Sequence, residues 1–256
     1  MSQQPILKVT NIRKTFGGLV ALNDVSMDIE SGKMTMLIGP NGSGKTTLIN
    51  VISGFYKPDS GRVVYSDKDI TGMAPNKIST HGLVRTFQVP APFTKLSVME
   101  NLLIAGEGNP GESFIKAPIK PLWYKKEKEI YDRAEEVLKL IKLKMPDQMA
   151  GNLSGGQLKL LEVGRVLMTG AKMLMMDEPA SGLNPTVAHG IFESLSEIKQ
   201  RLGLTFLIIE HRLDIALRYV DYVYAMAQGA VISHGTGDKV MNDPKVIEGY
   251  LGVPCP

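Results

Sequence analysis

Residues 39–46 read Gly39-Pro-Asn-Gly-Ser-Gly44-Lys45-Thr46, a full match to the pattern G-x-x-x-x-G-K-[ST]. A short apolar run at residues 33–38 precedes this stretch and a helical pattern at residues 45–52 follows it, which predicts strand, loop and helix. Glycines in such a loop let backbone N–H groups turn toward phosphate oxygens, and the helix adds its positive N-terminus. An ordinary glycine-rich turn is the alternative, and it does not explain why a strand pattern precedes the loop and a helix pattern follows it. We call residues 39–46 the phosphate loop.

A pair of acidic residues follows a second apolar strand. Met173-Leu-Met-Met176 is the pattern of a buried strand, and it ends in Asp177-Glu178. Beside a phosphate loop, Asp177 is placed to hold Mg²⁺, and Glu178 to orient and deprotonate an attacking water. The alternative is a strand that ends in two solvated acids. Together with the phosphate loop, the pair predicts nucleotide hydrolysis rather than binding alone.

A second anion-binding helix start lies far from the first. Leu153-Ser-Gly-Gly-Gln157, which we call the signature segment, opens a predicted helix that ends at Met168. Ser154 and Gln157 have the spacing of a capping box, and the glycines allow a phosphate to approach the backbone. As a helix cap alone the segment would be unremarkable. Because the sequence contains one phosphate loop, a second phosphate-binding element makes sense if it covers ATP held by another subunit.

The rest of the chain divides into an α/β part and a helical part. Residues 6–16 and 19–29 are predicted to form a hairpin, and residues 61–65 and 83–87 to be further strands of the same lobe. Helices are predicted from Ser97, over residues 125–143 and over residues 154–168, with a Gly- and Pro-rich loop at residues 106–123. The α/β pattern resumes with strands at residues 173–176 and 204–209, a helix at 186–202 and a hairpin at 222–227 and 230–234. The expected domains are residues 1–88 (β lobe and phosphate-loop part), 89–170 (helical lobe) and 171–256 (remaining α/β core).

Composition excludes several classes of protein. The 256 residues are 43% hydrophobic and 21% charged, which is ordinary for a globular protein. The net charge of +3 is spread along the chain, so no nucleic-acid partner is expected. Cys255 is the single cysteine, which suits a reducing cytosol. No signal pattern or apolar run long enough to span a membrane is present, so a membrane role would require a partner.

The order of these motifs resembles the ATP-binding cassette (ABC) family over nearly the whole chain. The matching positions are Phe16, the phosphate loop, Gln88 in Arg85-Thr-Phe-Gln88, the signature segment, Asp177-Glu178, Ser181-Gly-Leu-Asn184 and His211. Singly, Phe16 would be read as a core residue and His211 as a strand-end histidine. The resemblance implies an α/β P-loop NTPase fold of the ABC ATPase type, with an antiparallel β lobe and an inserted helical lobe. Asn184 departs from the commonest family pattern, which has Asp there, so a charge-dependent role at this position is in doubt.

The resemblance also implies roles for individual residues. Glu178, His211 and Gln88 would be catalytic: His211 would contact the γ-phosphate and hold Glu178 in place, and Gln88 would sense Mg²⁺ and the water. Thr46, Gln88 and Asp177 would hold Mg²⁺. Phe16 would stack on the adenine of ATP. The remaining nucleotide-binding residues would be Gly39, Pro40, Asn41, Gly42, Ser43, Gly44, Lys45, Thr46 and Thr47 of one subunit, with Ser154, Gly155, Gly156 and Gln157 of the other.

Partners and location follow from the same resemblance. They are a second ABC ATPase subunit (itself or a similar one), transmembrane permease subunits and, indirectly, an extracytoplasmic substrate-binding protein. The chain would be cytoplasmic and peripheral on the inner face of the cell membrane. The oddly apolar residues 89–126, including Phe93 and Trp123, are the expected contact with the permease, although Trp123 fits packing within the lobe equally well.

Finer similarity points to the ATPase subunit of branched-chain amino-acid importers. It rests on residues 82–88, residues 205–214 and the ending at residues 243–252. Relatives that import urea or amides, or that drive lipopolysaccharide export, stay open as alternatives. So do an ABC-type ATPase that acts on ribosomes or DNA repair complexes and a nucleotide-binding regulator without hydrolysis.

Overall fold

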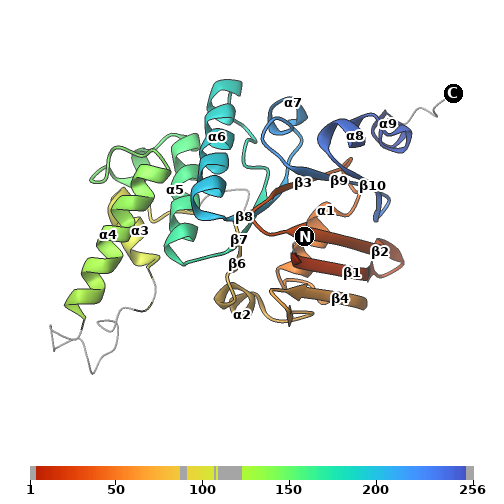
Figure 1. Ribbon diagram of the computed structural model, residues 1–256, viewed down its shortest axis with the longest axis horizontal. Coiled ribbons are helices and arrows are strands. Elements are labelled where there is room, and N and C mark those ends of the chain that lie inside the picture. Colours follow the sequence, from red (N-terminus) through yellow and green to blue (C-terminus); the bar gives the residue numbers. More distant parts are fainter. Residues whose placement is uncertain (1–3, 87–90, 107, 109–122, 252–256) are drawn as a thin grey trace.

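The computed structural model describes residues 4–86, 91–106, 108 and 123–251. Its described strands form two sheets, shown at one end of the molecule in Figure 1, while helices α3 (Val98–Ile104), α4 (Tyr124–Leu140) and α5 (Gly155–Met168) gather at the other end. Within the described ranges, no helix is long and apolar enough to cross a membrane.

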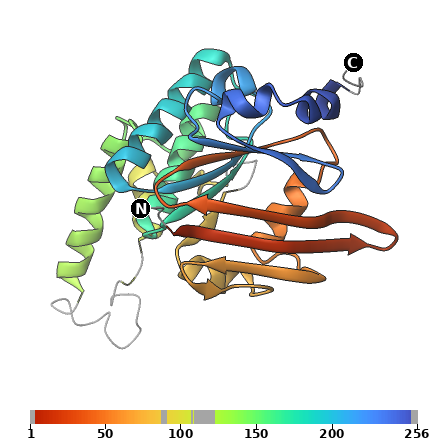
Figure 2. The same cartoon turned by 45° about the vertical axis from the view of Figure 1, so that its right-hand side comes forward.

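The first sheet is antiparallel and has the strand order β2-β1-β4-β5. Strands β1 (Pro5–Phe16) and β2 (Leu19–Glu30) form the predicted hairpin, with Phe16 paired to Leu19 and Pro5 to Glu30. Strands β4 (Ser60–Tyr65) and β5 (Lys68–Asp69) extend the sheet beyond β1. Alternate residues of β2 are buried, so one face of this sheet packs on the core (Figure 2).

The second sheet has the order β10-β9-β3-β8-β7-β6. Its parallel strands are β3 (Met34–Ile38), β6 (Leu83–Arg85), β7 (Met173–Asp177), β8 (Thr205–Ile209) and β9 (Tyr222–Ala227), and β10 (Ala230–Gly235) runs antiparallel to β9. Ile209 pairs with both Leu37 and Asp177. The carboxyl ends of β3, β7 and β8 therefore lie at one edge, where the loops after them meet.

Two hydrophobic clusters cover the two faces of the parallel sheet. On β8, Phe206 and Ile208 belong to the cluster with α5 and α6 (Pro185–Leu202), whereas Leu207 and Ile209 belong to the cluster with the antiparallel sheet and α1 (Lys45–Ile52). Burial on both faces explains why the strand sequences are continuous apolar runs. Helices α2 (Pro75–Thr80), α7 (Leu213–Ala216), α8 (Gly237–Met241) and α9 (Pro244–Leu251) and a 3₁₀ turn at Ala150–Asn152 complete the described elements.

Most predicted elements are confirmed, and one was placed wrongly. The strand expected at residues 83–87 does not join β4: β6 pairs with β7, Leu83 opposite Met173, in the other sheet. Its pairing partner lies about ninety residues further along the chain, and local pattern carries no information about such a partner. Phe87 and most of the predicted loop at residues 106–123 lie outside the described residues.

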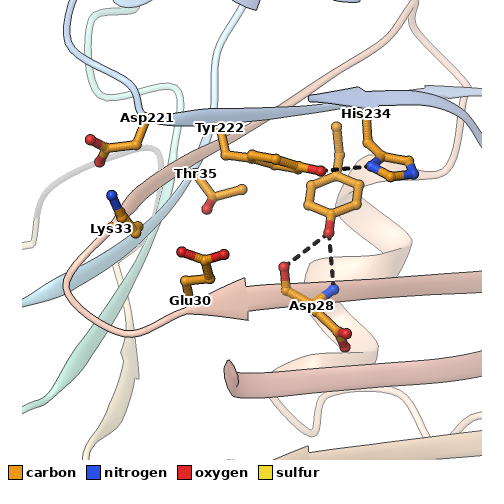
Figure 3. A pocket seen from close by; sticks show the side chains of 8 residues that line it. Asp28, Glu30, Lys33, Thr35, Asp221, Tyr222 and His234 are labelled. Atoms are coloured by element: carbon orange, nitrogen blue, oxygen red, sulfur yellow. Dashed lines mark hydrogen bonds between the residues drawn. The ribbon is translucent and has the colours of Figure 1, made fainter. Parts of the chain in front are cut away.

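A pocket of about 330 Å³ lies where the two sheets approach each other (Figure 3). The Tyr224 hydroxyl accepts from the Asp28 N–H (3.1 Å) and donates to the Asp28 carbonyl (2.9 Å), which links β9 to β2. Tyr222 Oη lies 2.7 Å from His234 Nδ1. The carboxylates of Glu30 and Asp221 also line this pocket, which would repel phosphate groups.

Candidate nucleotide-binding and hydrolysis site

The phosphate loop joins β3 to α1 at the carboxyl edge of the parallel sheet. Gly39 has φ +155°, and a Cβ there would lie 2.3 Å from the Met226 carbonyl oxygen, so only glycine fits. Helix α1 begins at Lys45, which directs its N-terminus into the loop. The local sequence therefore builds the predicted strand, loop and helix start.

Lys45 and Ser43 are the polar groups that suit a bound phosphate. Lys45 is 6% exposed, and its ammonium donates to the carbonyls of Gly39 (2.8 Å) and Pro40 (3.0 Å). Burial lowers the pKa of Lys45, while Glu178 and Asp177 act in the opposite direction. The buried Ser43 hydroxyl has no hydrogen-bond partner among the described residues. An orphaned buried hydroxyl beside a buried ammonium fits the oxygens of a phosphate.

A cavity of about 320 Å³ opens in front of this loop. Phe16, at the end of β1, is 42% exposed, and its ring meets Tyr56 edge-on at 5.2 Å. Lys14 Nζ lies 5.5 Å from the centre of the same ring. An exposed aromatic face beside a phosphate site is suited to stacking on a base. The cavity is lined by Phe16, Leu19, Val20, Ala21, Asn41, Gly42, Ser43, Gly44, Lys45, Thr46, Thr47, Glu178, Ile209 and His211.

Glu178 and His211 come together although they are 33 positions apart. His211 Nε2 lies 3.2 Å from Glu178 Oε1, and both side chains line the cavity. Glu178 has φ +51°, a left-handed conformation that is rare outside glycine and is held here by tertiary contacts. A carboxylate held at a phosphate site by a histidine has the geometry of a general base.

Asp177 lies next to Arg85, a residue that was not among the predicted site residues. Arg85 Nη2 is 3.5 Å from Asp177 Oδ2, and Arg85 Nη1 also donates to Asn50 on α1. Burial raises the pKa of Asp177, and the Arg85 guanidinium opposes this rise. Within the described residues, no group of three or more His, Cys, Asp or Glu side chains is placed to hold a metal ion. Gln88, predicted both as catalytic and as a metal ligand, lies outside the described residues.

The signature segment does not line the cavity of its own chain. Ser154 caps α5 as predicted: its hydroxyl accepts from the Gln157 N–H (3.4 Å), and Gln157 Oε1 accepts from the Ser154 N–H (2.9 Å). A Cβ on Gly156 would lie 2.5 Å from Val187 Cγ1, so close packing of α5 on α6 already requires this glycine. A glycine was expected at position 156 so that a phosphate could approach the backbone. Packing against Val187 is a second reason for a glycine there.

Asn184 caps helix α6. Its Oδ1 accepts from the Val187 N–H at 2.9 Å. Asparagine and aspartate cap helices about equally well, so this function needs no charge. The cap explains how Asn184 can stand where the commonest family pattern has aspartate.

Two buried charged residues near Glu178 were also missed by sequence reasoning. They are Glu210, which follows β8, and Lys159, in the second turn of α5. Glu210 stands between Ile209 and His211, where a charged residue after a strand is ordinarily solvent-exposed, so the sequence did not mark it as buried. Nothing in the sequence pairs Lys159 with Glu178.

Comparison with known proteins agrees with this geometry. The family model described as "ABC transporter" matches residues 22–181. A protein of Archaeoglobus fulgidus called "Probable branched-chain amino acid transport ATP-binding protein LivG" is 51% identical over 96% of this chain and 95% of its own. A protein of the same name from Methanocaldococcus jannaschii is 50% identical over 96% and 97%. The Escherichia coli K12 protein "High-affinity branched-chain amino acid transport ATP-binding protein LivG" is 36% identical over 97% and 98%.

Solved structures show the same fold. The ADP conformation of an ATP-binding cassette of an ABC transporter has a TM-score of 0.84 at 49% identity, covering 98% of this chain and 100% of that one. A dimeric post-hydrolysis cassette bound to ADP and Pi shares the fold at 23% identity, with a TM-score of 0.70, covering 90% and 98%. With a phosphate loop and an acid–histidine pair on one sheet edge, this chain belongs to the ABC transporter family, as an ATP-binding and ATP-hydrolysing subunit.

Proposed function

We propose that this chain is one of two ABC ATPase subunits that power import of branched-chain amino acids through a membrane permease. The observation that carries the proposal is the division of its phosphate-binding elements. The phosphate loop, Glu178 and His211 line one cavity, whereas the signature segment lies outside it and begins a separate helix. An anion-binding helix end away from the chain's own nucleotide site fits ATP held by another subunit.

The predicted site residues each have a separate role in hydrolysis. Phe16 stacks on adenine, and Lys45 and Ser43 bind phosphate oxygens. Thr46, Asp177 and Gln88 would hold Mg²⁺, which neutralises phosphate charge when bound. Glu178 orients a water whose oxygen attacks the γ-phosphorus, and its carboxylate accepts the water proton while the bond to the β–γ bridging oxygen breaks. His211, 3.2 Å from Glu178, keeps the carboxylate in place.

The permease contact is proposed within residues 89–126. Phe93 is 48% exposed, yet its position is firmly held. Buried Asn101 accepts from the Phe93 N–H (2.9 Å) and donates to the Phe93 carbonyl (3.0 Å), while the Arg165 guanidinium lies 5.2 Å from the ring centre. An exposed aromatic ring on a rigid backbone suits a docking contact. Ile115, Ile119 and Leu122, also part of the predicted contact, lie outside the described residues.

The transported substrate is proposed from the relatives' names alone, which refer to branched-chain amino acid transport. An importer of this kind would receive its substrate from an extracytoplasmic binding protein, and the chain would act as a peripheral subunit on the inner face of the membrane. Uptake of labelled leucine into vesicles that contain the chain with its co-purified permease, with the binding protein supplied, would test this directly. Uptake of urea or an amide instead would replace the substrate and keep the ATPase assignment.

The Glu178→Gln variant tests the two-subunit mechanism. Glutamine keeps the size of the side chain and removes the base, so we expect ATP binding to persist, hydrolysis to fall at least a hundredfold and an ATP-bound dimer to accumulate. Size-exclusion chromatography with and without ATP measures the dimer, and phosphate release measures turnover. Glu193→Gln, an identical change at an exposed position of α6, is the control. A Glu178→Gln chain that stays monomeric with ATP would contradict the nucleotide sandwich.

A further inference from the structure

Two buried charges, Lys159 and Glu210, surround the backbone that carries Glu178. Lys159 is 9% exposed and Glu210 is 1% exposed. Buried lysines and glutamates are rare unless they are paired, because removing a charge from water is costly. Neither residue lines the nucleotide cavity, so binding of ATP does not account for their burial.

Lys159 reaches from α5 to the backbone of the acidic pair. Its ammonium donates to the Glu178 carbonyl at 2.9 Å, and the Ser181 N–H donates to the same carbonyl at 3.1 Å. On the other side, the Glu178 N–H donates to the Ile209 carbonyl at 2.9 Å. These contacts hold Glu178 at its φ of +51°, and Lys159 is the one among them that comes from the helix of the signature segment.

Glu210 holds both sides of the Glu178–His211 pair with one carboxylate. Its Oε1 accepts from the Ala180 N–H at 2.6 Å, and its Oε2 accepts from the N–H groups of His211 (2.9 Å) and Arg212 (3.2 Å). The turn after β7 and the turn after β8 are thereby fixed to each other. Burial lowers the pKa of Lys159, while the negative charges of Glu210, Glu162 and Glu178 raise it.

We propose that Lys159 is a positioning residue that makes the placement of Glu178 depend on the position of helix α5. Lys159 stands five residues after the helix cap Ser154, a rise of about 7.5 Å along the helix. Movement of the signature segment onto the other subunit's ATP would therefore be passed through Lys159 to this chain's own catalytic carboxylate. The inference rests on the proposed two-subunit site and adds a physical link between its two nucleotides.

Variants of Lys159 in the full-length chain, alone and combined with Glu178→Gln, test the link. Lys159→Met removes the donor and the charge; Lys159→Arg keeps both. We expect Lys159→Met to lower kcat for ATP at least tenfold, to leave ATP affinity by calorimetry within about twofold, and to reduce the Hill coefficient for ATP. Lys159→Arg should restore at least part of kcat. Lys139→Met, at an exposed position of α4, is the matched control.

The double variant separates positioning from a general loss of structure. If Lys159 acts through Glu178, adding Lys159→Met to Glu178→Gln lowers residual turnover no further, whereas independent effects multiply. The inference would be overturned if the effects of the two substitutions on turnover multiply in the double variant, or if Lys159→Met leaves kcat and the Hill coefficient unchanged. Either result would leave the proposed site intact. If Glu178→Gln alone keeps its turnover, the proposed hydrolysis site fails, and the inference fails with it.

Discussion

Replacing Glu210 by glutamine is the sharpest test of how the fold holds its catalytic residues. Glutamine has nearly the same size and shape but a single acceptor oxygen and no charge. The native carboxylate receives three backbone N–H groups, one on Oε1 and two on Oε2. The new amide oxygen can keep the pair from His211 and Arg212 or the single contact from Ala180. In either orientation, the amide nitrogen, itself a donor, faces a backbone donor.

The expected cost follows from this count. At least one buried N–H loses an acceptor, which costs about 1–3 kcal/mol, and the contacts that remain lose their charge-assisted component. Lys159 also loses one of the negative charges that offset its burial. We therefore expect Glu210→Gln to lower the free energy of unfolding by about 2 kcal/mol or more, which corresponds to a fall in Tm of about 4–8 °C for a chain of this size.

The assay is thermal unfolding followed by circular dichroism without nucleotide, with phosphate release measured on the same samples. Glu193→Gln is again the control and should leave Tm within about 1 °C, because exposed substitutions usually change stability little. The turnover of Glu210→Gln should fall even at temperatures where the chain is fully folded. A change in Tm no larger than that of the control would refute the view that Glu210 satisfies these buried donors.

Three further predictions concern the loop, the permease contact and acid stability. Lys45→Ala should weaken ATP binding in calorimetry by at least tenfold and abolish turnover, because a buried charge contact to phosphate is lost; unchanged affinity would mean that the phosphate loop is misread. Phe93→Asp should leave ATP binding by the isolated chain intact but uncouple ATPase activity from transport in the assembled complex, and normal transport would place the contact elsewhere. The Thr15 hydroxyl, followed by Lys14, lowers the pKa of Asp59 from 3.8 to about 2. The contribution of ionised Asp59 to stability is therefore complete above pH about 4 and lost as the pH falls toward 2. Asp59→Asn should flatten the dependence of Tm on pH in this window, and an unchanged dependence would contradict this role of Asp59.

Much of the site could be predicted because its signals are local. The phosphate loop needs a strand, glycines and a helix start in immediate succession, and all three stand next to one another in residues 33–52. The cap at Ser154 and the hairpin of β1 and β2 also depend on neighbours in sequence, and the structure confirms both. The division of the chain into residues 1–88, 89–170 and 171–256 stays a prediction.

The contacts that orient the reacting groups could not be predicted in this way. The contact of His211 with Glu178, 3.2 Å in the structure, was implied by the family resemblance and not by any local pattern. The ion pair of Arg85 with Asp177 and the bond from Lys159 to the Glu178 carbonyl were not predicted, and each joins segments from different parts of the chain. These contacts depend on the order of the strands in the sheet, which local sequence does not reveal. For the same reason, residues 83–87 were predicted in the wrong sheet. Periodicity reports which face of an element is buried but not which element covers it.

By itself, therefore, the sequence determined that this chain binds a nucleoside triphosphate at a strand–loop–helix turn. It also determined which residue types can perform hydrolysis there. The tertiary structure alone decided that Glu178 adopts a left-handed conformation, that Lys159 binds its carbonyl, and that Glu210 binds the N–H of Ala180 in the same turn. The physical reason is that phosphate binding by a loop uses backbone groups within a few residues of each other. Positioning a catalytic carboxylate instead requires buried charges and hydrogen bonds from β8 and α5, which only the folded chain brings together.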